Sequence, residues 1–322
     1  MLDFLESAGH GITVIDTGFH RPRFDAAYLI VENGRAAYVD TGTNHAVPRL
    51  LAALEAQGLG PDAVDWLIVT HVHLDHAGGA GRLMQHLPNA RLVVHPRGAR
   101  HMVDPAALMD GARAVYGEAV FERDYGTIEP VAAQRIVSPA DGDTLELAGR
   151  PLRFIDTPGH ARHHHCIWDE ASRGWFTGDT FGIGYQELLS AQGRHIIPSS
   201  TPVQFEPDAM RRSIERLLQA DPQRVYLTHF GATGDVQRLA ALTLRQVDAM
   251  VRVALEAPFD GSRDHELQDR LEALYLEEWR RCGPVGDEAS VRDLLALDIE
   301  LNAQGLAVWR QRQRESAARA VS

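Results

Sequence analysis

The chain has 322 residues, of which 44% are hydrophobic, enough for one large domain or two small ones with a substantial core. Its 44 acidic and 32 basic side chains give a net charge of −12, which disfavours a polyanionic partner such as nucleic acid. The two cysteines, Cys166 and Cys282, are too few for a disulfide framework, so a reducing cytoplasm is expected. No apolar run is long enough to cross a membrane, and residues 1–6 lack the features of a signal peptide.

Short apolar runs separated by turn signals occupy the beginning of the chain, a pattern typical of strands. We predict strands near Gly11–Thr17, Ala26–Glu32 and Ala36–Asp40, then a helix near Val47–Gln57. The next apolar run, Trp66–Val69, is short and rich in β-branched and aromatic residues, which predicts a buried strand.

Three histidines and an aspartate follow this run directly, in the order His71-Val72-His73-Leu74-Asp75-His76. The cluster therefore lies where a strand ends and a loop begins. His71 and His73 alternate and can direct two nitrogens toward one point, whereas Asp75 and His76 turn with the loop toward a second point. Neutral imidazole and carboxylate groups suit zinc and related divalent ions. An ordinary polar loop is the alternative, but such loops seldom gather four side chains of this kind, so we favour a metal site.

The middle of the chain continues with a predicted helix from Gly79 to His86, a strand at Arg91–His95 and helices within residues 97–130. A second set of strands is predicted near residues 144–147, 151–155, 165–168 and 174–177. The predicted helix Pro207–Gln219 begins with a proline, which suits a first helical turn, and the strand Arg224–Leu227 follows. Runs of strands with helices outside each half predict an α+β sandwich of two sheets packed face to face.

From about residue 235 the composition changes to helix formers. We predict three helices, at Val236–Ala257, Asp264–Arg281 and Glu288–Arg314, separated by the turn signals Pro258–Gly261 and Gly283–Gly286. Two apolar stripes are expected on the second and third of these helices, formed by Leu267, Leu271, Leu274 and Trp279, and by Leu294, Leu295, Ile299 and Leu306. The chain is accordingly divided into a main domain, residues 1–235, and a helical extension, residues 236–322. Packing or dimerisation and a lid over the site are both open roles for the extension.

The metal-loop motif resembles the H-x-H-x-D-H signature of the metallo-β-lactamase-fold superfamily. Four further motifs of that superfamily occur in its order, namely Asp40-Thr41-Gly42, Thr157-Pro158-Gly159-His160, Thr177-Gly178-Asp179 and Leu227-Thr228-His229. The resemblance covers roughly residues 10–235, and five motifs in order are far more specific than any one of them. It implies a four-layer αββα sandwich with a C-terminal helical extension, similar to glyoxalase II and lactonases. Fold and function separate widely in such superfolds, so the resemblance does not name the substrate.

The resemblance also implies two divalent metal ions, most simply Zn²⁺, with Fe or Mn as alternatives. The first ion would be held by His71, His73 and His160, the second by Asp75, His76 and His229, and Asp179 would bridge both. Such ions, about 3.5–4 Å apart, can hold a bridging hydroxide that attacks a carbonyl or phosphoryl centre. Asp75 is the expected catalytic residue, which would orient this group or relay its proton. Three further residues, Asp40, Thr70 and His164, are expected to hydrogen-bond around the ligands rather than bind metal.

Substrate contacts are expected from His20 in an early loop and from Tyr185 and His195 in the stretch after Asp179. For His20, a plain surface position is an equal alternative. Lactonases of the superfamily usually carry a tyrosine three residues after this aspartate, but this chain has Gly182 there. A lactonase assignment is therefore weakened.

We predict a metal-dependent hydrolase that acts on a small ester, thioester, lactone or phosphodiester, without nucleic-acid or membrane partners, in the cytoplasm. A homodimer is left open. Two alternatives remain: an iron-dependent redox enzyme of the same fold, such as a sulfur dioxygenase or an oxygen-reducing type, and a metal-retaining binding or signalling protein with little turnover. Flavodiiron-type relatives replace the second histidine of the signature with glutamate, whereas this chain keeps His73. Zinc β-lactamases commonly use a cysteine where this chain has Asp179, which disfavours a β-lactamase.

Overall fold

The computed structural model describes residues 2–200, 202–257 and 265–321. The chain forms two compact units, and each is described by itself. Unit 1 comprises Met1–Asp156, His163–Gly178 and Ala220–Val236, whereas unit 2 comprises Thr157–Arg162, Asp179–Gln219 and Gln237–Ser322. The division of the chain into residues 1–235 and 236–322 stays a prediction.

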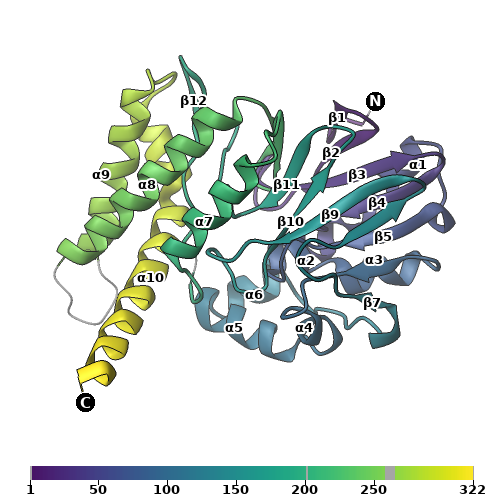
Figure 1. Cartoon of the computed structure of the whole chain (residues 1–322), viewed down its shortest axis with the longest axis horizontal. Helices are drawn as coiled ribbons and strands as arrows, with labels where there is room; N and C mark the ends of the chain where they lie inside the picture. Colours follow the sequence, from purple (N-terminus) through teal and green to yellow (C-terminus); the bar gives the residue numbers. More distant parts are fainter. Residues whose placement is uncertain (1, 201, 258–264, 322) are drawn as a thin grey trace. The chain divides into compact units, whose positions relative to one another are not determined.

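The first sheet of unit 1 has seven strands in chain order (Figure 1). They are β1 (Leu5–Gly9), β2 (Ile12–Asp16), β3 (Ala26–Glu32), β4 (Arg35–Val39), β5 (Val64–Ile68), β6 (Arg91–Val93) and β7 (Ile136–Val137). The strands pair antiparallel from β1 to β4 and parallel from β4 to β7. Because parallel strands end at the same edge of a sheet, Asp40, the metal loop and His95 follow neighbouring strand ends.

The second sheet of unit 1 has six strands, in the order β15-β14-β11-β10-β9-β8. Their bounds are β8 (Thr144–Leu147), β9 (Arg150–Asp156), β10 (His165–Asp169), β11 (Gly174–Gly178), β14 (Arg224–Leu227) and β15 (Gly231–Thr233). Strands β11 and β14 are parallel. The chain therefore leaves both strands at one edge of the sheet, toward Asp179 after β11 and His229 after β14.

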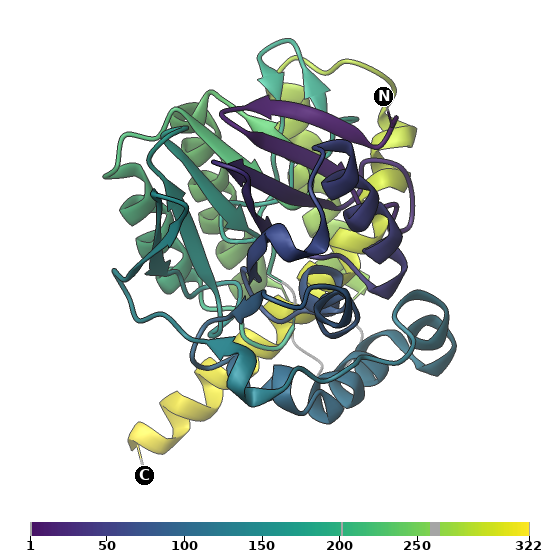
Figure 2. The same ribbon diagram turned by 90° about the vertical axis from the view of Figure 1, so that its right-hand side faces the viewer.

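The two sheets of unit 1 pack face to face through a shared apolar core, and Figure 2 shows the purple strands of the first sheet beside the teal to green strands of the second. Large buried side chains from both sheets meet there, including Tyr28, Phe154, Phe176 and Tyr226. The other face of the first sheet packs against α1 (Val47–Ala56) and α3 (Ala80–His86), whose buried residues belong to a second core. Helix α1 buries Leu50, Ala53 and Leu54 on one face, which is the spacing of an amphipathic helix. The predicted α+β sandwich is confirmed.

The remaining helices of unit 1 surround the metal loop or lie within the segment that was predicted to be helical. They are α2 (Leu74–Ala77), α4 (Ala99–Val103), α5 (Ala106–Tyr116) and α6 (Glu118–Asp124), with short 3-10 turns at Asn44–Ala46, Pro61–Ala63 and Ala133–Arg135. Phe121 of α6 and the nearby Tyr125 pack against Phe19 and against Leu74 of the metal loop. This aromatic cluster holds α6 beside the metal loop.

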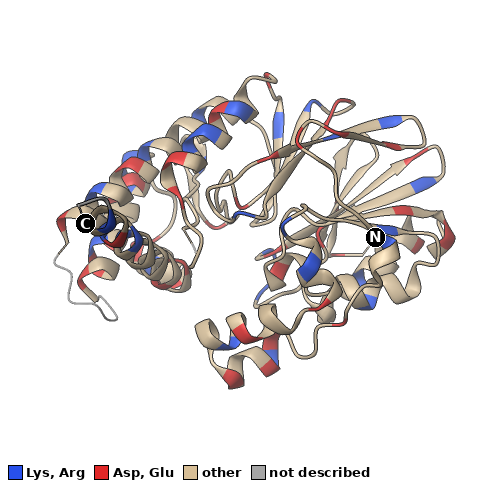
Figure 3. Ribbon diagram, turned by 60° about the horizontal axis from the view of Figure 1, so that its bottom comes forward, with Lys and Arg blue, Asp and Glu red and all other residues tan. Residues whose placement is uncertain are grey.

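Unit 2 consists mainly of helices. Its elements are β12 (Leu189–Ser190), β13 (Gly193–Arg194), α7 (Pro207–Leu218), α8 (Val236–Glu256), α9 (His265–Arg281) and α10 (Glu288–Val321), where Val236 itself belongs to unit 1. The predicted stripes are largely buried, with Leu267, Leu271, Trp279, Leu295, Ile299 and Leu306 inside and Leu274 and Leu294 partly covered. Acidic and basic residues are interspersed along these helices (Figure 3).

Three expectations for the extension concern where its helices begin and end. The predicted turn Pro258–Gly261 and the first residue of the helix predicted from Asp264 lie outside the described residues. Helix α10 continues to Val321, past its expected end at Arg314. Within residues 2–200, 202–257 and 265–321, no helix is long and apolar enough to cross a membrane.

Candidate metal centre

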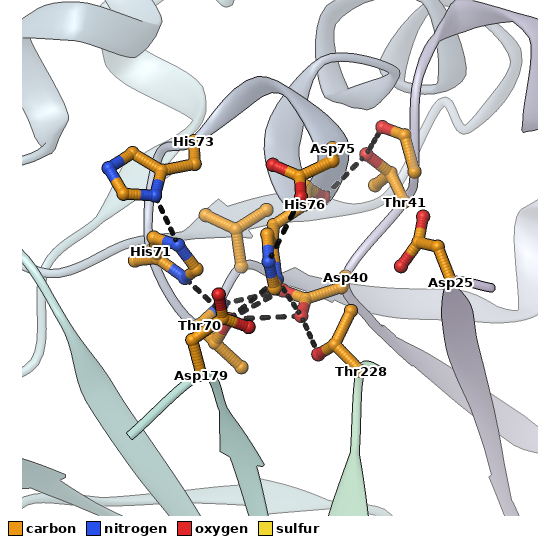
Figure 4. A network of polar contacts seen from close by, with 12 residues as sticks. Asp25, Asp40, Thr41, Thr70, His71, His73, Asp75, His76, Asp179 and Thr228 are labelled. Atoms are coloured by element: carbon orange, nitrogen blue, oxygen red, sulfur yellow. Dashed lines mark hydrogen bonds and ion pairs between the residues drawn. The ribbon is translucent and has the colours of Figure 1, made fainter. Parts of the chain in front are cut away.

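The metal loop, His71–His76, begins three residues after the end of β5 and turns into the single-turn helix α2. His73 is the residue directly before α2, so the chain changes direction between the pair His71 and His73 and the pair Asp75 and His76. His71 and His76 are fully buried, whereas His73 and Asp75 are partly exposed. The loop thus presents its ligand-type side chains from two sides of one tight turn (Figure 4).

Asp75, His76 and His229 converge on one point in unit 1. Their ligand atoms lie within 4.8 Å of one another. The Nε2 atom of His229 lies 3.4 Å from Oδ2 of Asp75, and the Nε2 atom of His76 lies 3.7 Å from the same oxygen. One carboxylate oxygen and two imidazole nitrogens therefore face each other, which is the donor set expected for the second ion.

The opposite nitrogen of each histidine is held by an oxygen. Nδ1 of His229 donates to the backbone oxygen of Phe24 at 3.0 Å, and Nδ1 of His76 donates to Oδ2 of Asp40 at 2.9 Å. A proton on Nδ1 leaves the lone pair on Nε2, so both rings are in the tautomer that binds metal through Nε2. The hydrogen bonds thereby prepare the converging nitrogens for a cation.

Asp40 is the centre of the network that orients the loop. Its carboxylate accepts hydrogen bonds from the backbone N of Thr70 at 2.7 Å, from the Thr70 hydroxyl at 2.9 Å and from the Thr228 hydroxyl at 2.9 Å (Figure 4). Asp40 thus joins the ends of β4, β5 and β14 behind His76. The supporting role expected for Asp40 and Thr70 stays a prediction.

His71 and His73 form a second pair in unit 1. Nε2 of His71 lies 2.9 Å from Nδ1 of His73, and Nδ1 of His71 lies 3.2 Å from the Thr70 hydroxyl. The ring of His164 stacks on that of His71 with centroids 4.9 Å apart. His164 therefore contacts His71 through its ring, and its role as a supporting residue stays a prediction.

The other two predicted ligands lie in unit 2. Nε2 of His160 lies 3.5 Å from Oδ2 of Asp179, and Nδ1 of His160 donates to the backbone oxygen of Ser199 at 3.3 Å. The Ser199 hydroxyl lies 3.5 Å from Oδ2 of Asp179. His160 and Asp179 are thus brought together, with the His160 ring again in the Nε2-binding tautomer.

The donor chemistry of these groups fits divalent ions of the zinc type. Imidazole nitrogens and carboxylate oxygens are the common zinc ligands, and each ligating histidine usually donates its other N–H to an oxygen. His76, His160 and His229 all meet this second requirement. The residues present therefore fit the metal that the sequence implied.

Asp25 is a buried acid near the metal loop that the sequence analysis missed. Its carboxylate is fully buried, and Oδ2 accepts a hydrogen bond from the Thr17 hydroxyl at 3.0 Å. Burial raises the pKa of Asp25 to about 7, although the nearby His229 and His76 act in the opposite direction. A single acid before a predicted strand carries no distinctive signal, so only the fold could identify it.

His20 lies in an aromatic wall beside His229. The His20 ring packs on Phe19 at 4.0 Å and on Phe24 at 5.1 Å, and the Phe24 ring meets His229 edge-on at 5.3 Å. Phe24 is partly exposed and His20 is exposed. Burial lowers the pKa of His20, while the carboxylates of Asp124 and Asp75 raise it.

Tyr185 and His195, the other expected substrate contacts, are 1% exposed and lie in unit 2. The Tyr185 hydroxyl donates to Oδ1 of Asp298 in α10 at 3.2 Å. Burial lowers the pKa of His195 to about 4, and its two ring nitrogens have no hydrogen-bond partner among the described residues. Their role as substrate contacts stays a prediction.

The chain is similar to known proteins across most of this framework. The family model of the metallo-beta-lactamase superfamily matches residues 20–229. The matched segment begins at His20 and ends at His229, so it contains the metal loop and both unit 2 ligands. It stops before the helical extension.

Individual relatives are distant. The chain is 23% identical to a metallo-beta-lactamase fold-containing protein of Sulfurisphaera tokodaii, over 78% of this chain and 89% of that protein. It is 31% identical to a hydroxyacylglutathione hydrolase of Klebsiella pneumoniae, over 58% of this chain and 60% of that enzyme. A metallo-beta-lactamase family protein of Thermus thermophilus has the same fold, with a TM-score of 0.68, 21% identity and 95% of both chains covered.

Proposed function

Because this chain belongs to the metallo-beta-lactamase superfamily, we propose that it is a hydrolase dependent on two divalent ions, most simply Zn²⁺. The observation that carries the proposal is the convergence of Nε2 of His76, Nε2 of His229 and Oδ2 of Asp75. Both histidines are held in the metal-binding tautomer from behind. Histidines that bind a metal almost always donate their other ring N–H to an oxygen in this way.

The proposed ligands of the first ion are His71, His73 and His160, and those of the second are Asp75, His76 and His229. Asp179 is proposed to bridge the two ions. Chain connectivity supports the contribution of unit 2, because Asp179 directly follows Gly178 at the end of β11. His160 lies four residues after the end of β9 and five before the start of β10.

Two bound ions would supply Lewis acidity and make water a nucleophile at neutral pH. The chain's own groups provide orientation and proton transfer. The Asp75 side chain is partly exposed to solvent, so it can orient a water molecule and accept its proton. The Asp40 network holds His76 and the loop backbone still, which keeps the distances between the reacting groups constant.

The proposed substrate is a small ester, thioester, lactone or phosphodiester with an apolar group. The partly exposed Phe24 and the exposed His20 beside His229 support an apolar contact near the second ion. The Klebsiella relative is named as a hydroxyacylglutathione hydrolase, so a thioester is the first substrate to test. The net charge of −12 argues against a polyanionic substrate.

We further propose a cytoplasmic enzyme with a small-molecule substrate and without a nucleic-acid or membrane partner, and leave a homodimer open. Cys166 and Cys282 are both buried and form no disulfide, which supports a reducing compartment. Light scattering of the purified chain would settle the oligomeric state.

Metal analysis combined with a substrate panel tests the proposal. Protein purified under metal-replete conditions should carry two ions per chain, and thioester, lactone and phosphodiester substrates should distinguish the reaction. Asp179→Ala should disturb both ions and abolish hydrolysis, whereas His164→Ala should cost about 10–100-fold. One ion or none per chain, or a larger loss for His164→Ala than for Asp179→Ala, would contradict the ligand assignment. A strongly bound iron with oxygen consumption and no hydrolysis would favour the redox alternative.

A further inference from the structure

A polar cavity lies in unit 1, at the sheet edges where β6, β7 and β9 end. Its volume is about 280 Å³, and its polar lining comes from His95, Arg97, Asp141, Asp156 and His165. The ring of Phe154 forms part of its apolar wall. None of these residues belongs to the proposed metal ligands, so the cavity is a distinct feature.

His165 presents an unused hydrogen-bond acceptor in the wall of this cavity. Its Nε2 donates to the backbone oxygen of Val69 at 2.9 Å, so the lone pair lies on Nδ1. Among the described residues, no donor reaches that Nδ1 atom, although the residue is only 2% exposed. Burial lowers the pKa of His165 to about 3, which keeps the ring neutral. An acceptor that faces a cavity in this way is open to a hydrogen bond from a ligand or from water.

Two carboxylates, those of Asp141 and Asp156, are further acceptors in the lining of the cavity. Nδ1 of His95 accepts from the backbone N of Arg97 at 3.1 Å, so Nε2 of His95 donates to Oδ1 of Asp156 at 3.1 Å. The Asp141 carboxylate accepts from the backbone N of Asp156 at 2.9 Å. The cavity therefore contains two carboxylates and a neutral imidazole acceptor against one guanidinium, that of Arg97.

A ligand of this cavity has to donate hydrogen bonds and carry positive charge. An ammonium group offers three N–H donors, which matches the His165 nitrogen and the two carboxylates. An anion would find only Arg97 as a favourable partner. The volume lies just below the usual range of ligand pockets, about 300–1,000 Å³, and the Phe154 ring suits a short apolar body. We propose that this cavity binds a small primary amine in its ammonium form.

The position of His165 gives such binding a route to the metal loop. Its backbone N donates to the oxygen of Thr70 at 3.0 Å, and its side chain holds the oxygen of Val69. His165 therefore fixes the two residues that connect β5 with His71. The amine site itself does not depend on the proposed hydrolase activity, because its residues and its ligand chemistry are separate.

Calorimetric titration of the zinc-loaded full-length chain with n-butylammonium tests the proposal, with butyrate and n-butanol as matched probes. Nitrogen NMR of the histidine rings locates the site, since a donor to Nδ1 of His165 shifts that nitrogen. We expect n-butylammonium to bind, to shift the His165 signal and to outcompete both other probes. Asp141 is exposed, so Asp141→Asn should fold and weaken amine binding about tenfold. Glu146→Gln, an exposed carboxylate of β8 outside the cavity, is the matched control and should bind as the wild type does. No binding at millimolar amine, equal binding of butyrate, or binding without the His165 shift would overturn the proposal.

Discussion

The Asp40 carboxylate is the acceptor in each of its hydrogen bonds with Thr70, Thr228 and His76. A side chain that carried an N–H donor at this position would therefore face other donors. The Asp40→Asn variant would place an NH2 group against at least one of these donors, although it keeps the shape of the side chain. We expect metal affinity to fall about 10–100-fold, because the His76 ring loses the partner that fixes its tautomer. Competition with a chelator measures this affinity directly.

Asp65→Asn is the matched control for this substitution. Asp65 pairs with Arg35 at the surface, away from the loop, so metal affinity should be unchanged. If Asp40→Asn binds metal as tightly as Asp65→Asn does, the network around Asp40 does not orient the ligands.

Asp25 should make the stability of the metal-free protein depend on pH. Burial raises the pKa of Asp25 to about 7, so the folded chain keeps a proton that the unfolded chain has released. By linkage, this residue's contribution to the free energy of unfolding falls as the pH rises from about 4 to about 7 and is constant above that range. Asp25→Asn removes the titration, so the variant should gain stability relative to the wild type over the same window, on the order of a few kcal/mol.

Urea unfolding of chelator-treated protein at several pH values checks this difference. Asp110→Asn, at an exposed carboxylate in α5, should follow the wild-type profile. A constant difference between Asp25→Asn and the wild type across the window would show that Asp25 ionises normally in the folded chain.

The sequence identified candidate site residues that are clustered in one short motif. It missed residues whose importance depends on how the folded chain packs. His71, His73, Asp75 and His76 stand out because four ligand-type side chains follow one strand. Asp25 is a single acid whose burial depends on how residues 17–25 fold against the end of β14, where Ala26 bonds to Thr228. No local pattern contains that information.

At the scale of elements, Gly178 fixes the approach of β11 to the metal loop. Its φ is +46°, and a Cβ atom there would lie 2.5 Å from Nε2 of His164 and 2.7 Å from the Thr70 hydroxyl. Gly178→Ala therefore combines backbone strain with displacement of two supporting residues. We expect a loss of roughly 2–4 kcal/mol in stability together with weaker metal binding.

Gly142→Ala separates these two effects. Gly142 also has a positive φ, +91°, but a Cβ atom there would meet nothing within 4 Å. Its cost should be about 1–2 kcal/mol from the backbone alone, with unchanged metal binding. Thermal unfolding and chelator competition on both variants measure the two quantities, and equal metal affinity in the two variants would refute the steric argument.

The predicted elements with long apolar patterns are found in the structure, and the missed ones are short. Strand β3 has the bounds that were predicted, and β2 and β4 differ from the predicted ones by one residue at each end. Strands β7, β12 and β13 have only two residues each, too few for any periodic signal. Strand β1 has one large apolar side chain, Leu5, and forms because it pairs with β2. Pairing of this kind is a tertiary interaction that the sequence pattern does not report.

At the scale of the whole molecule, the helical extension packs in the same unit as the segment after Asp179. The Thr243 hydroxyl in α8 donates to the oxygen of Phe181 at 3.1 Å, and the Tyr185 hydroxyl reaches Asp298 in α10. The backbone N of Ser200 donates to Oδ1 of Asn302 at 2.6 Å. These contacts join positions about 60–110 residues apart, which is why the sequence showed the helices but not what they support.

Removing the extension should therefore disorder residues 179–219 rather than simply open a site. A chain truncated after Gly234 loses the hydrogen-bond partners of Phe181, Tyr185 and Ser200 and exposes their buried surroundings. Because His160 and Asp179 share this unit with Ser199, we expect fewer than two ions per chain and faster hydrogen exchange across residues 179–219. A chain truncated after Arg314 loses only the last residues of α10, of which 315–319 are exposed, and should keep wild-type exchange and metal content. If the longer truncation retains two ions and wild-type protection, the packing of α8–α10 does not hold this segment, and a lid over the site becomes the better explanation of the extension.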